Sequence, residues 1–210
     1  MALMDDLYRD VDRLVRMGVR PSDLLLDPGP WVVGTYRVGR ALRRLPRFIG
    51  LPLLMLHRPW EALVQTVTGA VLPGNAHIEG GLHLSHPTSI VVSPETRIGR
   101  DCELAQGTTI GVGGRGTERG APFIGDRVYI GPGAAIFGPI RIGNDVAIGA
   151  NAVVREDVPD GAVVAGVPAK VVSNRGSKDF VVPGRKMPPL GRLLRSLFNV
   201  PAGSGRQLAA

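Results

Sequence analysis

Three histidines that lie within ten residues of each other are the first candidates for chemistry in this chain. They are His77, His83 and His86, and a fourth, His57, lies upstream. An imidazole titrates near neutral pH, so each of them could take a proton from a hydroxyl group as a general base. No carboxylate cluster accompanies them, and Cys102 is the single cysteine. We therefore expect neither a metal site nor an intrachain disulfide.

A glycine-rich segment is the second candidate. It reads "GVGGRGTERGAPF" over Gly111–Phe123 and has glycine at four of its first six positions. Because glycine adopts backbone conformations closed to other residues, we expect a mobile loop here. Its arginines, Arg115 and Arg119, could bind an acceptor molecule, although solvated surface charge is the plainer interpretation of each.

A six-residue repeat must position these groups. Between residues 124 and 154 an aliphatic residue stands at every sixth position, and the spacing extends back through Ile110 and, in a second register, through Ile90. A helix has a period of 3.6 and a strand a period of 2, so neither explains the repeat alone. Three such faces make a triangular coil of eighteen residues, stacked as a solenoid. We expect the following side chains to point inward: Ile124, Ile130, Ile136, Ile142, Ile148 and Val154.

Residue composition divides the chain into three zones. Residues 1–70 show helical apolar spacing, with Leu7, Val11 and Leu14 on one stripe of the first helix. Residues 71–172 carry the repeat, interrupted by the loop at 111–123. Residues 173–210 form an irregular tail rich in basic residues and prolines, with one short helix expected at Leu190–Phe198.

Composition and charge exclude other classes of protein. The chain has 29 glycines, 18 prolines, 5% aromatic residues and a net charge of +7, which is typical of a turn-rich fold with a small aliphatic core. The acidic N-terminus does not resemble a signal peptide, and the apolar run Phe48–Leu56 is too short to span a bilayer. We expect a cytoplasmic protein that binds no nucleic acid, because the basic tail lacks a known binding motif.

Four arginines flank that apolar run: Arg40, Arg43, Arg44 and Arg47. A basic and apolar segment of this kind can lie on a membrane surface. The simpler expectation is a helix that packs within an oligomer.

The repeat zone resembles the hexapeptide-repeat acyltransferases. The resemblance rests on "IGDRVYIGPGAAI", "IGNDVAIGANAVV" and "AGVPAKVV", and on "LSHPTSIVVSPETRIGRDCELAQGTTIG" (Leu84–Gly111) for the serine O-acetyltransferase-like branch. It implies a mainly β fold: a left-handed parallel β-helix with an N-terminal α-helical region and an irregular C-terminal tail. It also implies a homotrimer that binds acetyl-CoA in a groove between subunits and needs no metal.

The same resemblance assigns roles to individual residues. His86 matches the catalytic histidine of the family and is expected to be the general base. The loop is expected to cover the acceptor and to stabilise the oxyanion with backbone N–H groups of Val112, Gly113 and Gly114. Positions implied to contact acetyl-CoA are Pro132 and Ala150 at coil corners, and Arg155 and Lys170 near the nucleotide phosphates.

Three positions depart from the serine acetyltransferase pattern. Val71, Ser85 and Ala121 stand where that branch has two acidic residues and a second histidine, which help to recognise the charged groups of serine. We therefore expect an acetyl-CoA-dependent O-acetyltransferase that acts on a sugar or another small hydroxylated metabolite. Serine O-acetylation is the alternative, and a catalytically silent solenoid that binds a partner is a further one.

Overall fold

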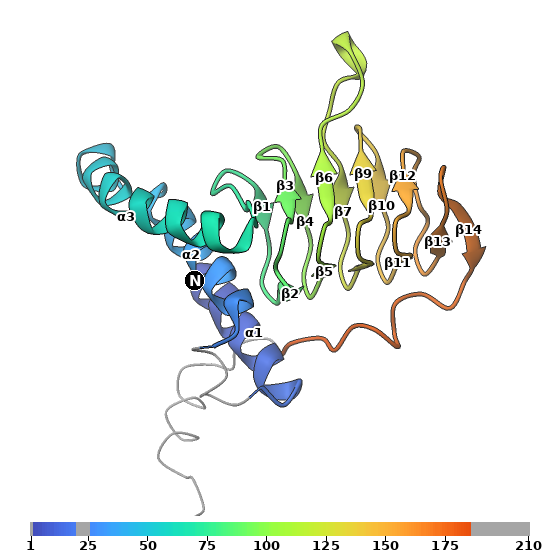
Figure 1. Cartoon of the computed structure of the whole chain (residues 1–210), viewed down its shortest axis with the longest axis horizontal. Helices are drawn as coiled ribbons and strands as arrows, with labels where there is room; N and C mark the ends of the chain where they lie inside the picture. The colour runs from blue at the N-terminus through green and yellow to red at the C-terminus, as the bar shows by residue number, and fades with distance from the viewer. Residues whose placement is uncertain (1, 20–25, 186–210) are drawn as a thin grey trace, which may run out of the picture.

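The computed structural model describes residues 2–19 and 26–185, and its strands wind into a parallel β-helix with three flat faces (Figure 1). Within these residues, three α-helices precede the first coil, and a segment without regular secondary structure follows the last strand. The tail helix expected at Leu190–Phe198 lies outside the described residues.

Each face of the coil is one sheet of short strands. The first face contains β1 (His77–Ile78), β4 (Arg97–Ile98), β7 (Phe123–Ile124) and β10 (Arg141–Ile142). The second contains β2 (His83–Ser85), β5 (Glu103–Ala105), β8 (Tyr129–Ile130), β11 (Ala147–Ile148), β13 (Val163–Ala165) and β14 (Lys170–Ser173). The third contains β3 (Val91–Val92), β6 (Thr109–Gly111), β9 (Ala135–Phe137) and β12 (Val153–Val154). All pairs of neighbouring strands are parallel except β13 and β14.

The six-residue register gives the solenoid its core. On the first face Ile78, Ile98, Ile124 and Ile142 stack in successive coils. The five isoleucines from Ile124 to Ile148 that the repeat singles out are 0% exposed, and Val154 is 2% exposed. The expectation that these residues form a buried column is therefore confirmed. Burial of this aliphatic area is the main favourable term for such a stack.

The helices are α1 (Ala2–Arg16), α2 (Pro28–Leu42) and α3 (Arg47–Thr68). The carboxylate of Asp27 accepts a hydrogen bond from the backbone N–H of Gly29 at 2.9 Å and so caps the start of α2. α3 continues through Pro52 and Pro59 and ends at Thr68, and the left-handed φ of 66° at the following Gly69 terminates the helix.

Buried charges attach the first two helices to the solenoid. Arg37 of α2 donates from Nε to Oδ2 of Asp10 on α1 at 2.8 Å, and from Nη1 to the carbonyl of Ile78 at 2.6 Å. Asp10 in turn accepts from the backbone N–H groups of Gly81 and Leu82. Of the apolar stripe expected on α1, Leu7 and Leu14 are partly buried, whereas Val11 is 54% exposed.

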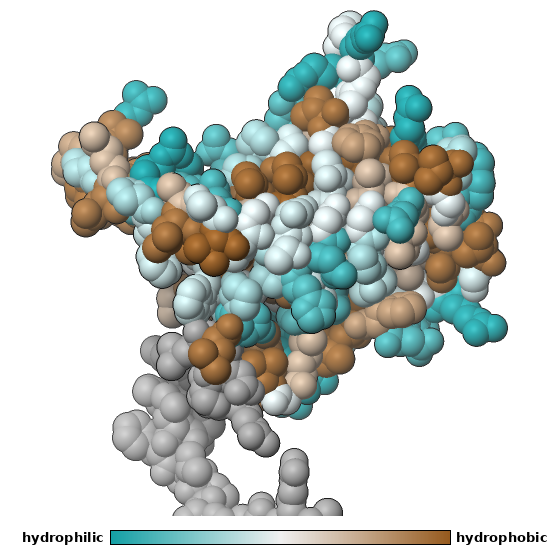
Figure 2. Space-filling view, viewed as in Figure 1, coloured by the Kyte–Doolittle hydropathy of each residue, from teal (hydrophilic) through white to brown (hydrophobic). Residues whose placement is uncertain are grey.

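Apolar side chains gather on the surface of α3 (Figure 2). Phe48, Met55 and Leu56 are each more than three quarters exposed. None of the helices in the described part of the chain combines the length and apolarity that a membrane crossing requires.

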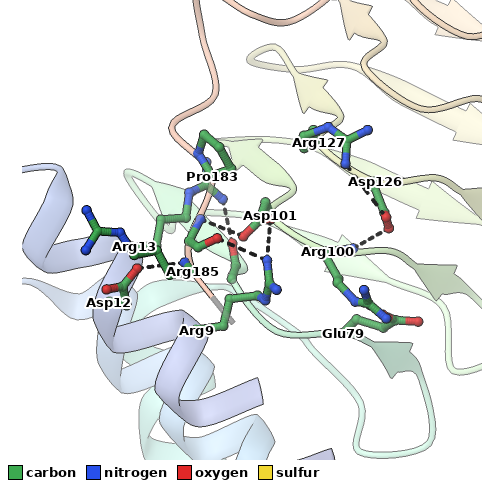
Figure 3. A network of polar contacts seen from close by, with 12 residues as sticks. Arg9, Asp12, Arg13, Glu79, Arg100, Asp101, Asp126, Arg127, Pro183 and Arg185 are labelled. Carbon is green, nitrogen blue, oxygen red and sulfur yellow. Dashed lines mark hydrogen bonds and ion pairs between the residues drawn. The ribbon is translucent and has the colours of Figure 1, made fainter. Parts of the chain in front are cut away.

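Residues 174–185, here called the strap, run from the last coil back to α1 (Figure 1). The ring of Phe180 stacks on Tyr129 of β8 with centroids 4.6 Å apart. The strap ends in a polar network: Gly184 donates its N–H to Asp101 at 2.9 Å, and Arg185 donates its N–H to Asp12 of α1 at 2.7 Å (Figure 3). Arg9 of α1 pairs with the same Asp101 at 2.8 Å.

Candidate active site

His86 lies at the corner between the second and third faces, directly after β2. Its side chain is exposed and its backbone φ is 54°, in the left-handed region that non-glycine residues rarely adopt. The N–H of Thr88 donates to its carbonyl at 2.6 Å. An exposed imidazole on a rigid corner is accessible to a substrate hydroxyl, which a general base requires.

Pro132 and Ala150 stand at this same corner in later coils. The N–H of Asn151 donates to the carbonyl of Pro132 at 2.8 Å, so the two corner turns are in direct contact. Gly107 and Thr88 form the corresponding bond at 2.9 Å in an earlier coil. The structure therefore places His86, Pro132 and Ala150 along one edge of the solenoid.

The glycine-rich loop leaves the solenoid at a different corner, between β6 and β7, and projects well away from the body (Figure 1). It is not featureless: Gly113 and Gly120 form an antiparallel bridge, and residues Gly116–Glu118 make a turn of 3₁₀ helix. Arg119 forms a two-point ion pair with Glu95 at 2.7 and 3.2 Å. Arg115 is exposed on the loop.

Gly113, one of the three expected oxyanion donors, already uses its backbone N–H in a hydrogen bond within the loop. The N–H of Gly113 donates to the carbonyl of Gly120 at 2.9 Å within the loop. A backbone N–H makes one good hydrogen bond, so Gly113 would have to release this one to stabilise an oxyanion, and its role stays a prediction. Val112 and Gly114 keep that role as a prediction.

A groove of about 710 Å³ lies at the base of the loop. Its lining includes Val112, Gly113 and Gly114 from the loop, Phe137 from β9, and Arg155 after β12. The structure thus brings the loop and one of the expected phosphate-binding cations together. His86 is not part of this lining, because it stands at another corner.

Lys170 lies at the start of β14, beside Arg155. Both residues line a smaller hollow of about 100 Å³. The ammonium of Lys170 lies 3.3 Å from Oε2 of Glu156, and both side chains are largely exposed. A surface ion pair of this kind contributes little to stability, so Lys170 remains available for an anionic ligand.

A buried carboxylate bonded to Ser85, the residue before His86, is the feature that sequence reasoning missed. Oε1 of Glu103, on β5, accepts a hydrogen bond from Oγ of Ser85 at 2.6 Å, and Oε2 lies 3.5 Å from Nδ1 of His83. Burial opposes ionisation of Glu103, but hydrogen bonds from His83 and Ser85 and the charge of Arg13 outweigh it and lower the pKa of its carboxyl group. The register gave a usable signal: Leu84 and Leu104 both point inward, so the residues before them, His83 and Glu103, had to be neighbours.

The other chemical candidates lie outside this arrangement. His77 is on the first face, where burial and the charge of Arg40 lower the pKa of its imidazole. Burial raises the pKa of the Cys102 thiol to about 12, so it stays protonated. Across residues 2–19 and 26–185, no three histidine, cysteine or carboxylate side chains come together as metal ligands would.

Comparisons with known proteins assign the chain and its fold to a family. The family model "Bacterial transferase hexapeptide (six repeats)" matches residues 121–156. A serine acetyltransferase from Helicobacter pylori (strain J99) is 36% identical over 150 residues, which are 71% of this chain and 84% of that protein. The chain belongs to the serine acetyltransferase family. As a member it is a hexapeptide-repeat enzyme, an acetyl-CoA-dependent acyltransferase, and its solenoid is a left-handed β-helix.

Two solved serine acetyltransferases resemble most of the chain. The Neisseria gonorrhoeae enzyme, solved in complex with serine, has a TM-score of 0.66 and 31% identity, covering 82% of this chain and 68% of that one. The Brucella abortus (strain S19) enzyme, solved in complex with coenzyme A, has a TM-score of 0.65 and 26% identity, covering 83% of this chain and 68% of that one.

Proposed function

We propose that the protein transfers the acetyl group of acetyl-CoA to the hydroxyl of L-serine, with His86 as the general base. The observation that carries the proposal is the similarity of most of the chain to serine acetyltransferases, one of them solved with serine bound. This favours serine over the sugar hydroxyl that the departures at three positions led us to expect.

His86 would act on the attacking hydroxyl. It takes the serine proton as the oxygen attacks the thioester carbonyl, and later returns a proton to the departing thiolate of coenzyme A. The negative charge that develops on the carbonyl oxygen needs fixed hydrogen-bond donors. The backbone N–H groups expected for this task are those of Val112 and Gly114, at the base of the loop.

Within one subunit, the proposed base and the proposed oxyanion donors lie at different corners of the solenoid. His86 is at the corner between the second and third faces, whereas the loop and Arg155 are at the corner between the third and first. We therefore propose a homotrimer in which the His86 corner of one subunit faces the loop groove of its neighbour. The pantetheine arm then lies along Pro132 and Ala150, and Arg155 and Lys170 face the phosphates.

Mixing experiments test this shared site. A His86→Ala variant and a Gly114→Pro variant, each inactive alone, should regain part of the activity when their subunits are exchanged into mixed trimers. Light scattering on the parent protein should report a trimer. A fully active monomer would overturn the arrangement.

A neutral hydroxyl compound is the second candidate acceptor. Val71, Ser85 and Ala121 carry no charge at neutral pH, and a zwitterion leaving water needs charged partners. Steady-state kinetics with L-serine and a panel of sugars decide between the two. A kcat/KM for serine of about 10⁴ M⁻¹s⁻¹ or more, the lower end for dedicated enzymes, supports serine. A value far below that of a sugar would overturn the proposal that serine is the acceptor.

A cytoplasmic location stays a prediction.

A further inference from the structure

The backbone of His86 is unlike that of the other corner residues. Six described residues other than glycine have a positive φ, and five of them belong to columns that recur from coil to coil. One column contains Ser89, Gly107, Gly133 and Asn151, and the other contains Gly81, Asp101, Arg127, Asp145 and Gly161. His86 belongs to neither: Ser85 pairs with Ala105, so the counterpart of His86 in the next coil is Gln106, which has no positive φ. A conformation of this kind persists only where its surroundings enforce it.

The residue before His86 is fixed by its side chain. Ser85 donates from Oγ to Oε1 of Glu103 in the next coil at 2.6 Å, a charge-assisted bond. Glu103 is 7% exposed, so this bond is shielded from water. The orientation of Ser85 therefore depends directly on the position of the Glu103 carboxylate.

Arg13 of α1 fixes that carboxylate. Its guanidinium donates from Nη2 to Oε2 of Glu103 at 3.0 Å and from Nη1 to the carbonyls of Gly81 at 2.5 Å and Cys102 at 2.6 Å. Gly81 and Cys102 lie in successive coils, so one buried arginine joins both coils to the helix. Arg13 is 1% exposed.

The cluster is not a second nucleophilic centre. In a serine–histidine–carboxylate triad the two partners bond opposite nitrogens of the imidazole. Here the Ser85 hydroxyl, at 3.4 Å, and the Glu103 carboxylate, at 3.5 Å, both approach Nδ1 of His83. His83 therefore cannot pass a proton from Ser85 to Glu103, and the geometry is that of a support.

We propose that Ser85 and Glu103 are positioning residues that hold the general base His86 in its strained backbone conformation, with Arg13 linking this support to the N-terminal helix. The proposal rests on the proposed function of His86 and adds residues to that site. It assigns the N-terminal helix a part in turnover as well as in folding.

The experiment is a double-mutant comparison. Ser85→Ala, Ser85→Thr and Glu103→Gln are made in the parent chain and in a His86→Ala chain. Turnover, KM for acetyl-CoA and melting temperature are measured for each. Glu79→Gln, which removes a carboxylate paired with Arg100 at 2.7 Å on the first face, is the matched control.

In the parent chain, Ser85→Ala should lower kcat by about 10- to 100-fold, the scale of a misplaced catalytic group. The KM for acetyl-CoA and the melting temperature should stay unchanged, and Ser85→Thr should restore most of kcat because it restores the hydroxyl. In the His86→Ala chain, Ser85→Ala and Glu103→Gln should cause no further loss, because groups that act through one base are not additive. Glu79→Gln should leave kcat unchanged.

Three results would overturn the proposal. One is full activity of Ser85→Ala in the parent chain. This result tests the proposal even if the Glu103→Gln variant does not fold. Another is an equal fractional loss in the parent and His86→Ala chains, which would indicate a general structural effect. The third is full activity of His86→Ala, which would remove the proposed base as well and is thereby distinguished from failure of the support alone.

Discussion

Arg37 of α2 and Asp10 of α1 form a buried ion pair, with Nε and Oδ2 separated by 2.8 Å and the Arg37 side chain 1% exposed. Both partners also bond backbone groups of the first coil, through the carbonyl of Ile78 and the N–H of Gly81. Asp10 and Arg37 therefore join both helices to the solenoid through one buried hydrogen-bond network. Such a network is stable only when every polar group in it has a partner.

Asp10→Ala should strongly destabilise the protein. It leaves the Arg37 guanidinium buried without its carboxylate, and breaking a buried pair in this way costs about 3–5 kcal/mol. The free energy of unfolding from urea titration measures the loss. Glu95→Gln, which breaks the exposed pair with Arg119, is the control and should change little. Equal losses in both variants would show that the buried pair has no special role.

His86→Ala should lower turnover by about 100-fold or more, the scale expected for loss of a general base. Binding of acetyl-CoA should persist, because the imidazole is expected to contact the acceptor hydroxyl. Turnover is measured by thiol release and binding by calorimetry. Unchanged turnover with the best acceptor would remove His86 from the mechanism.

Arg155→Ala should raise the KM for acetyl-CoA several-fold with little change in kcat. Arg155 lines the groove at the base of the loop, where its charge would meet the nucleotide phosphates. Arg97→Ala, an exposed arginine on the first face, is the matched control. The assignment fails if the two variants have the same KM for acetyl-CoA.

The stability of the parent protein should fall in acid, and Glu103 should account for part of that fall. Its pKa in the folded chain is below the ordinary 4.5, so the folded state binds fewer protons than the unfolded state. The stabilisation is present above pH 4.5 and is lost as the pH falls through the lowered pKa. Melting temperatures from pH 7 to pH 3 should therefore fall less steeply for Glu103→Gln, and parallel curves would contradict this.

The core of the fold follows from the sequence, whereas its attachment to the helices does not. A six-residue register specifies which side chain of each strand points inward, so Ile130 or Ile148 could be placed without a structure. Helical periodicity gives no such rule for Arg13 and Arg37, because arginines are normally at the surface. Their burial depends on carbonyls and carboxylates that only the folded coils bring together. The division of the chain at residues 70 and 172 stays a prediction.

The candidate site could also be predicted only in part from the sequence. The corner position of His86 follows from counting, since it comes two residues after the inward-pointing Leu84. The hydrogen bond that occupies the N–H of Gly113 does not, because it depends on how the loop folds on itself. The local sequence therefore predicts the conformation of the coils well, but it predicts the conformation of a loop that leaves them poorly.

The strap has a consequence for the order of events during synthesis. A stack of coils can form progressively as the chain leaves the ribosome, because each coil needs only its predecessor. Contacts between Arg9 and Gly184, which are 175 positions apart, must wait until almost the entire described chain has been made. Until then α1 contacts the first coils through Asp10 and Arg13 but lacks its contacts with the strap. Closing this long loop carries an entropic cost that grows only slowly with its length, so the strap can still bind α1 after the coils have formed.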